Sequence, residues 1–328
     1  MLLKRPPRAP LLALAALLAA VLPARSAPAY KGAISVDAAT GAVLFEDNAD
    51  AVSPPASMTK LMTYAVLCDA IRAGSISLDT QVTIAHEDAK VAALKDSTEV
   101  WLRQGEVFSV EELIYAMMIQ SANDAAYALA HRAGGTVSAF VGMMNAKARE
   151  IGMTRSIFRS ANGFPPPSRR IADGDLSTPR DYAILSRYLL LHTDVLKYTS
   201  VKTRTFGAGV RLQPVLMTNH NHLLGRIPGV DGLKTGFTDG AGFCLAATAQ
   251  REGRRIIVVM MDSPDSRTRD LTMRELISQA FLRLPALGPA FTPSRAGASG
   301  PMRPPTSPVP TPTPSGGPVI RVPANIAY

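Results

Sequence analysis

A serine and a lysine stand three residues apart in the segment PASMTKLM, as Ser57 and Lys60. On a helix, residues at this spacing lie about 60° apart around the axis and roughly 4.5 Å along it, so the two side chains can touch. A serine attacks at neutral pH only when a neighbour accepts its proton. Lysine can do so if burial or a second cation favours its uncharged form. The pair predicts a nucleophile with its base; a helix cap beside a solvated lysine is the alternative.

Lys234, Thr235 and Gly236 form a second group, within a predicted strand. Successive strand residues point to opposite faces, so Lys234 and Gly236 share one face and Thr235 lies on the other. Glycine in a strand allows a ligand or another backbone to approach closely. The group predicts a binding site for a peptide that ends in a carboxylate, and Lys234 is the candidate second cation near Lys60.

The third group is Ser-Ala-Asn, between two predicted helices, with Ser121 and Asn123 as its polar residues. A loop hydroxyl can pass a proton, and an amide both donates and accepts hydrogen bonds. The same tripeptide recurs at Ser160 and Asn162, where it enters a loop rich in glycine and proline. We assign the chemistry to the first copy.

The alternating His220 and His222 could both ligate zinc from one face of a strand. A catalytic zinc site needs three protein ligands, and the neighbouring sequence offers no evident third. We predict no metal and no cofactor.

The elements that must position these residues follow from hydrophobic periodicity. Strands are expected near both chain ends and helices between them, which predicts an α/β (α+β) fold with one antiparallel sheet built from both ends, flanked by helices, and an inserted helical subdomain. The expected elements are a hairpin at 32–49, helices at 56–72, 109–120, from 123, 136–151 and 178–192, strands at 230–250 and 255–262, and a closing helix at 269–282.

The two ends differ in composition from the rest of the chain. Residues 1–29 have a basic start, an apolar run of twelve residues and small residues after it, the layout of a secretory signal. The run is too short for an ordinary membrane span, although an uncleaved anchor is the alternative. We therefore expect an exported protein, cleaved near residues 26 to 29.

Residues 283–328 hold 12 of the 26 prolines, and no acidic residue follows Glu275. Such a tail cannot bury enough apolar area to offset its ordering entropy, so we expect disorder there and a catalytic domain at 30–282. The net charge of +9 comes without a basic block or interleaved aromatic residues, which argues against nucleic-acid binding. A basic surface beside an anionic polymer or membrane face is the favoured interpretation.

The three motifs, in this order behind a secretory leader, resemble those of the penicillin-recognising serine peptidases. The flanking text PPASMTKLMT, MIQSANDAA and GVDGLKTGFT is similar to that of low-molecular-mass D-alanyl-D-alanine carboxypeptidases, over roughly residues 30–282. The resemblance implies a β-lactamase/transpeptidase-like fold. It also implies that Ser57 is the nucleophile, Lys60 its general base and Ser121 the proton relay to the leaving D-alanine, while Asn123 holds Lys60 and the substrate amide.

On the binding side, the resemblance implies that Lys234 and Thr235 bind the terminal carboxylate next to Gly236. The backbone N–H groups of Ser57 and Phe237 would form the oxyanion hole. The implied partners are peptidoglycan stem peptides ending in D-Ala-D-Ala, and β-lactams as covalent inhibitors. The implied location is the periplasm.

Three alternatives stay open. An endopeptidase for D-Ala–meso-diaminopimelate cross-links would share the chemistry. A class A β-lactamase needs a carboxylate to activate the deacylating water, and residues 151–177 offer only Asp173 and Asp175. A catalytically silent wall-binding protein would use charge and tail alone. Membrane association is left open, because a proline-rich tail stands where larger relatives continue into a second domain and an anchoring helix.

Overall fold

The computed structural model describes residues 29–286 and 290–292. The predicted leader lies outside the described residues except for Ala29. Most of the predicted tail, and with it the expectation of disorder, also lies outside them.

The main sheet has five strands, and all four strand pairs are antiparallel. Its order is β2-β1-β9-β8-β7, so the N-terminal hairpin pairs with the last strand, Gly32 opposite Met261. The predicted sheet from both chain ends is confirmed. The strand that carries Lys234 is at an edge of the sheet. The strands are β1 (Gly32–Asp37), β2 (Val43–Asp47), β7 (Val230–Thr238), β8 (Gly242–Arg251) and β9 (Arg254–Ser263).

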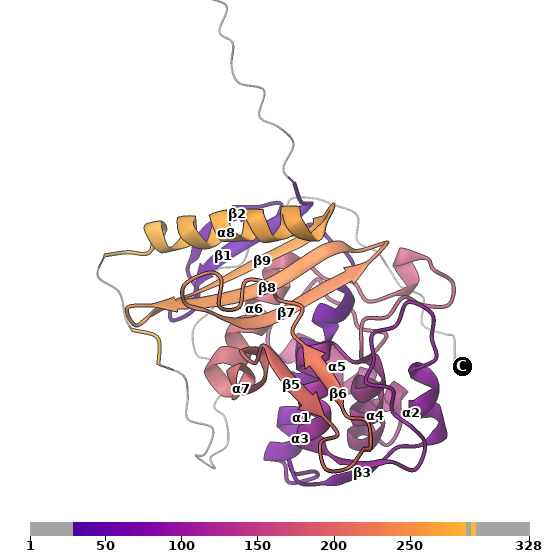
Figure 1. The fold of residues 1–328 in the computed structure, drawn as a ribbon. Helices are drawn as coiled ribbons and strands as arrows, with labels where there is room; N and C mark the ends of the chain where they lie inside the picture. The colour runs from indigo at the N-terminus through magenta and orange to yellow at the C-terminus, as the bar shows by residue number, and fades with distance from the viewer. Residues whose placement is uncertain (1–28, 287–289, 293–328) are drawn as a thin grey trace, which may run out of the picture. The chain divides into compact units, whose positions relative to one another are not determined.

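Both faces of the sheet are covered. Successive side chains of β9 point to opposite faces, and those on both faces are apolar. Ile256 and Val258 belong to the smaller apolar cluster, which is closed by α8 (Ser266–Arg283), whereas Ile257 and Val259 belong to the larger cluster with the other helices. Figure 1 shows α8 along one face and α6 with the inserted helices on the other side. The sheet is therefore a buried platform.

The inserted helices pack beneath the sheet, and several begin at the polar caps that favour helix starts. Ser109 Oγ accepts from the N–H of Glu112, and Thr178 Oγ1 accepts from that of Asp181. The predicted helices are all present. They are α1 (Thr59–Arg72), α3 (Val110–Tyr115) with the π-helical turn Ala116–Gln120, α4 (Asn123–Gly134), α5 (Val137–Glu150) and α6 (Pro179–His192).

Periodicity did not reveal the shortest elements, since three to six residues are too few to show a clear period. They are α2 (His86–Val91), α7 (Val195–Thr199), the 3₁₀ turns η1 (Ala56–Met58) and η3 (Ile171–Asp173), and two small two-stranded sheets, β3 (Gln81–Thr83) with β4 (Val107–Ser109) and β5 (Thr203–Phe206) with β6 (Val215–Thr218).

Packing continues beyond the predicted domain end at residue 282. Phe291 is buried, its N–H donates to the Gly253 carbonyl at 3.0 Å, and the Arg255 guanidinium lies 5.3 Å from its ring centroid. Within the described ranges, no helix has both the length and the apolar character needed to span a bilayer.

Candidate active site

Ser57 lies in η1, which leads directly into α1, so Lys60 is in the first turn of that helix. Lys60 Nζ is 3.0 Å from Ser57 Oγ. The lysine is fully buried, whereas the serine is partly exposed and lines a cavity. The structure therefore brings the predicted pair into contact, with the hydroxyl accessible and the amine shielded.

Two further oxygens hold the Lys60 amine. Nζ is 2.7 Å from Asn123 Oδ1 and 2.7 Å from the backbone carbonyl oxygen of Asn162. A carbonyl oxygen can only accept a hydrogen bond. A neutral amine has two N–H bonds and one lone pair, so these two oxygens take both N–H bonds and the lone pair is left for the Ser57 hydroxyl.

The surroundings of Lys60 favour this uncharged form. Burial lowers the pKa of Lys60 well below its usual value, and the positive charge of Lys234 lowers it further. The carboxylates of Asp124 and Asp175 act in the opposite direction and are outweighed. Lys60 is thus placed to accept the serine proton.

The edge strand β7 carries the predicted carboxylate-binding group. Lys234 and Thr235 are both buried, and Lys234 Nζ donates to the Thr235 carbonyl at 3.1 Å. Burial and the nearby charge of Arg269 lower the pKa of Lys234 to about 7. A lysine with this pKa retains much of its charge at neutral pH, and a bound carboxylate would favour the charged form further.

Gly236 allows the strand to lie directly against the turn of the serine. A Cβ at this residue would stand 2.4 Å from the Pro55 carbonyl oxygen and 3.2 Å from Met58 N, so any side chain would force the two segments apart. The expected close approach is thus made by another backbone. The next residue, Phe237, is half exposed, stacks on Phe243 with ring centroids 4.1 Å apart, and lines the cavity.

The first Ser-Ala-Asn segment lies where the π-helical turn ends and α4 begins. Ser121 is buried and has a left-handed backbone, with φ 62°. Asn123 begins α4, and its Nδ2 donates to Ser97 Oγ at 3.1 Å. Among the described residues, Lys60 has hydrogen bonds to Ser57 and Asn123 but not to Ser121.

Two buried carboxylates that the sequence did not single out as site residues shape the surroundings. Asp124 accepts the backbone N–H groups of Val100 and Leu102, which ties the segment between β3 and β4 to α4. Asp175 accepts Thr59 Oγ1 at 2.7 Å and Ser160 Oγ at 2.9 Å, so it ties the second Ser-Ala-Asn segment to the start of α1.

The second Ser-Ala-Asn copy, set aside at first, also reaches the centre, through the Asn162 carbonyl. The repetition of the tripeptide was the one available signal for it. No comparable signal marked Asp175, a carboxylate in a loop whose contacts are distant in sequence.

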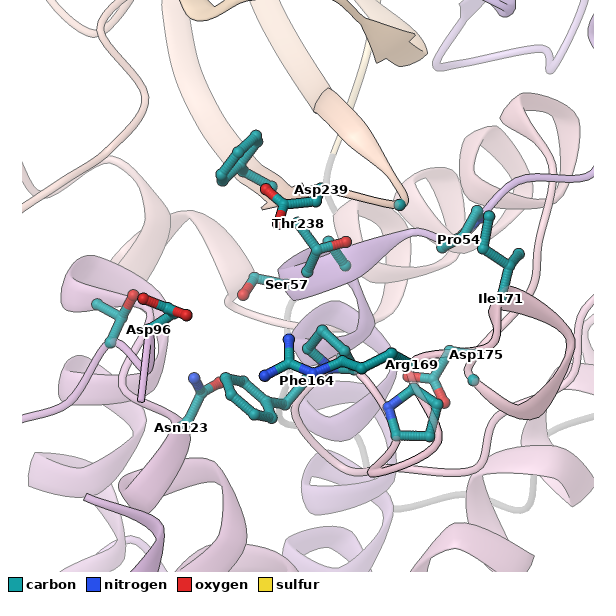
Figure 2. A pocket seen from close by; sticks show the side chains of 18 of the residues that line it. Pro54, Ser57, Asp96, Asn123, Phe164, Arg169, Ile171, Asp175, Thr238 and Asp239 are labelled. Atoms are coloured by element: carbon teal, nitrogen blue, oxygen red, sulfur yellow. The ribbon is translucent and has the colours of Figure 1, made fainter. Parts of the chain in front are cut away.

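Ser57 opens into a cavity of about 690 Å³ between the loop at 163–175, the segment at 95–98 and the end of β7 (Figure 2). Its lining includes Asn123, Phe164 and Phe237. A cavity of this size, with the Ser57 hydroxyl on its wall, can hold several residues of a peptide.

The two histidines differ in their surroundings. Nδ1 of His222 is 3.0 Å from Asp270 Oδ2, and burial together with Lys234 lowers the pKa of His220 to about 4. Arg269, close to these histidines in the fold, is buried and pairs with Asp270. Within the part of the chain that the structure describes, no three His, Cys, Asp or Glu side chains are grouped to hold a metal ion.

The family profile of the D-alanyl-D-alanine carboxypeptidases, peptidase family S11, matches residues 21–265. The chain belongs to this family. D-alanyl-D-alanine carboxypeptidase DacC of Escherichia coli is 36% identical over 251 residues, which are 76% of this chain and 60% of that protein. DacF of Bacillus subtilis is 30% identical over 76% of this chain and 62% of its own length. The S11 chain thus spans about three fifths of the length of these curated relatives.

Solved structures agree with the S11 fold. Penicillin-binding protein D2 from Listeria monocytogenes, in its ampicillin-bound form, has a TM-score of 0.67 and 32% identity, covering 78% of this chain and 98% of its own. Penicillin-binding protein 5 from Haemophilus influenzae has a TM-score of 0.70 and 30% identity, covering 78% of this chain and 72% of its own. The expected transpeptidase-like fold is confirmed.

Proposed function

We propose that this S11 protein is a periplasmic serine-type carboxypeptidase that removes the terminal D-alanine from peptidoglycan stem pentapeptides. The observation that carries the proposal is the position of the Lys60 amine, whose Nζ lies 3.0 Å from Ser57 Oγ and 2.7 Å from each of two acceptor oxygens, Asn123 Oδ1 and the Asn162 carbonyl. The family supports the substrate, and the leader-like N-terminus supports export.

In the acylation step, Ser57 transfers its proton to the Lys60 lone pair while Oγ attacks the carbonyl carbon of the penultimate D-alanine. The carbonyl oxygen becomes an oxyanion, for which the backbone N–H groups of Ser57 and Phe237 are the proposed donors. The contact of Gly236 with the Pro55–Met58 turn supports this assignment, since it brings the two backbone segments together.

The C–N bond then breaks, and the leaving D-alanine needs a proton on its amine. Ser121 is the proposed relay for that proton from Lys60, and the Lys234 ammonium with Thr235 Oγ1 is the proposed site for the free carboxylate of the leaving residue. Water then hydrolyses the ester on Ser57. The shortened stem peptide leaves as a free carboxylic acid, and the serine hydroxyl is regenerated on the enzyme.

A β-lactam presents a strained amide and a carboxylate to the same groups, so it is proposed to acylate Ser57 and to stay there. The geometry of Asp175 argues against rapid β-lactamase turnover. Both of its oxygens already accept hydrogen bonds, Oδ1 from the N–H groups of Arg159 and Ser160 and Oδ2 from the hydroxyls of Thr59 and Ser160. It has no free oxygen with which to activate water.

The test uses the purified mature protein. We expect D-alanine release from a pentapeptide, and mass spectrometry after penicillin treatment should locate one adduct on Ser57. Ser57→Ala should lose both the D-alanine release and the adduct, and it should fail to restore the wild-type phenotype in cells that lack the protein. A catalytically silent wall-binding protein would keep its cellular function without this hydroxyl. Loss of cross-linked dimers without D-alanine release would favour the endopeptidase, and rapid nitrocefin turnover would favour the β-lactamase.

A further inference from the structure

Charged groups line the part of the cavity that extends from Ser57 away from the carboxylate-binding strand residues. Of the described β7 residues, Phe237 and Thr238 line this cavity, whereas Lys234 and Thr235 do not. If Lys234 holds the leaving residue, the cavity faces the acyl side of the scissile bond. Its charged lining residues are Lys95, Asp96, Arg169, Arg170, Asp175 and Asp239.

Arg169 is directed into this cavity without a partner for its charge. Figure 2 shows its side chain extending from the loop into the pocket on the side of Phe164. Among the described residues, no ion pair or hydrogen bond engages its guanidinium. The neighbouring Arg170 differs, since its Nε is 3.6 Å from Asp173 Oδ2.

Asp96 enters the same cavity from the opposite wall, near Asn123 (Figure 2). Its carboxylate likewise has no ion-pair partner among the described residues. Both residues have a left-handed backbone, with φ 63° at Asp96 and 56° at Arg169. That conformation is unfavourable for an arginine in particular, and such residues concentrate at ligand sites, where the conformation directs a side chain.

We propose that Arg169 and Asp96 recognise one substrate side chain that carries both a free carboxylate and a free ammonium, on the acyl side of the scissile bond. A guanidinium binds a carboxylate through two parallel hydrogen bonds, and a carboxylate accepts from an ammonium. Because the two protein groups face one cavity from opposite walls without pairing, a ligand end with both charges satisfies both. This assignment rests on the proposed function for the identity of the acyl side.

The experiment compares three pentapeptides that differ only at the third residue: meso-diaminopimelate, with both groups, lysine, with the ammonium alone, and Nε-acetyl-lysine, with neither. Arg169→Ala should lower kcat/KM about tenfold for the diaminopimelyl peptide only, as expected for losing a hydrogen bond between charged groups. Asp96→Ala should lower it by a similar factor for the first two peptides and spare the third. Arg149→Ala, which removes an exposed arginine on α5 that does not line the cavity, is the control and should change none.

An equal fall on all three peptides, or no fall, in either variant overturns the proposal. Titration of the same peptides into Ser57→Ala by calorimetry supplies a second readout that needs no turnover. The affinities should decrease from diaminopimelyl to lysyl to acetyl-lysyl peptide, and equal affinities overturn the proposal. If the wild type releases D-alanine from none of the peptides, the proposed function fails, while the order of affinities still decides the recognition.

Discussion

The segments 121–123 and 160–162 have the same three residues, yet they reach Lys60 with different atoms. From the first comes a side-chain oxygen, Asn123 Oδ1, and from the second a backbone oxygen, the carbonyl of Asn162, each 2.7 Å from Nζ. In the first segment the asparagine begins a helix. In the second, Asn162 Oδ1 accepts the N–H of Phe164 and so stabilises its own turn.

This difference teaches that the backbone surrounding a tripeptide determines its use. The left-handed Ser121 and the start of α4 direct the Asn123 side chain towards Lys60. Asp175 accepts hydrogen bonds from the N–H and the hydroxyl of Ser160 and so fixes this segment. The carbonyl of Asn162, two residues further on, is thereby directed towards the same amine. The two identical tripeptides therefore each supply one acceptor oxygen to the same Lys60 amine.

The largest effect is expected from removing the Lys60 amine, which both segments contact. Lys60→Ala should lower the rate of acylation by fluorescent penicillin by about 10³-fold or more, as expected for loss of a general base. Substrate affinity, measured on the same variant, should be retained, whereas Lys234→Ala should weaken binding as well. Equal losses of affinity in both variants would contradict the assigned roles.

The next effect is on stability and concerns Asp175, which anchors the segment 160–162. Asp175→Ala leaves the buried Thr59 hydroxyl and the partly buried donors of Ser160 without their acceptor, so we expect about 3 kcal/mol less free energy of unfolding in denaturant titrations. Asp173→Ala, in the same loop but exposed, should change it by less than about 0.5 kcal/mol. Similar stabilities of the two variants would show that Asp175 does not hold the loop.

The comparison itself is tested by removing one asparagine side chain at a time. Asn123→Ala removes an acceptor of Lys60, so acylation should slow by about tenfold or more. Asn162→Ala keeps the carbonyl that Lys60 uses, and the expected loss is about threefold or less, from the weakened turn. Penicillin-labelling kinetics of both variants decide, and a larger loss in Asn162→Ala would reverse our interpretation.

The smallest effect is a shift with pH. Lys234 binds a carboxylate when charged, and its pKa is about 7, so kcat/KM should fall as pH rises above that value. The charge of Arg269 contributes to the lowered pKa of Lys234, so Arg269→Ala should move this alkaline limb to higher pH. The pH profile of kcat/KM measures the limb, and a shift to lower pH would contradict the assignment.

Local pattern was enough for much of the molecule. The strand character of 230–250 and 255–262 and the helical spacing after Ser57 were visible in short windows. Burial of a strand on both faces leaves a continuous apolar run, and burial of one helix face imposes a period on neighbouring residues. The sheet formed from both chain ends followed from the order of these elements. The three motifs could be recognised for a similar reason, since each lies within three or four consecutive residues.

The sequence alone therefore determined the longer elements, their order and the residue types available for chemistry. Tertiary structure decided what no short window contains: the Asn162 carbonyl on Lys60, the anchoring by Asp175, and the pairing of strands only three or four residues long. It also decided that the pKa of Lys60 is lowered well below its usual value, because that pKa depends on burial and on a lysine from a distant strand. Such terms act through space, and the chain sets them only when it is folded.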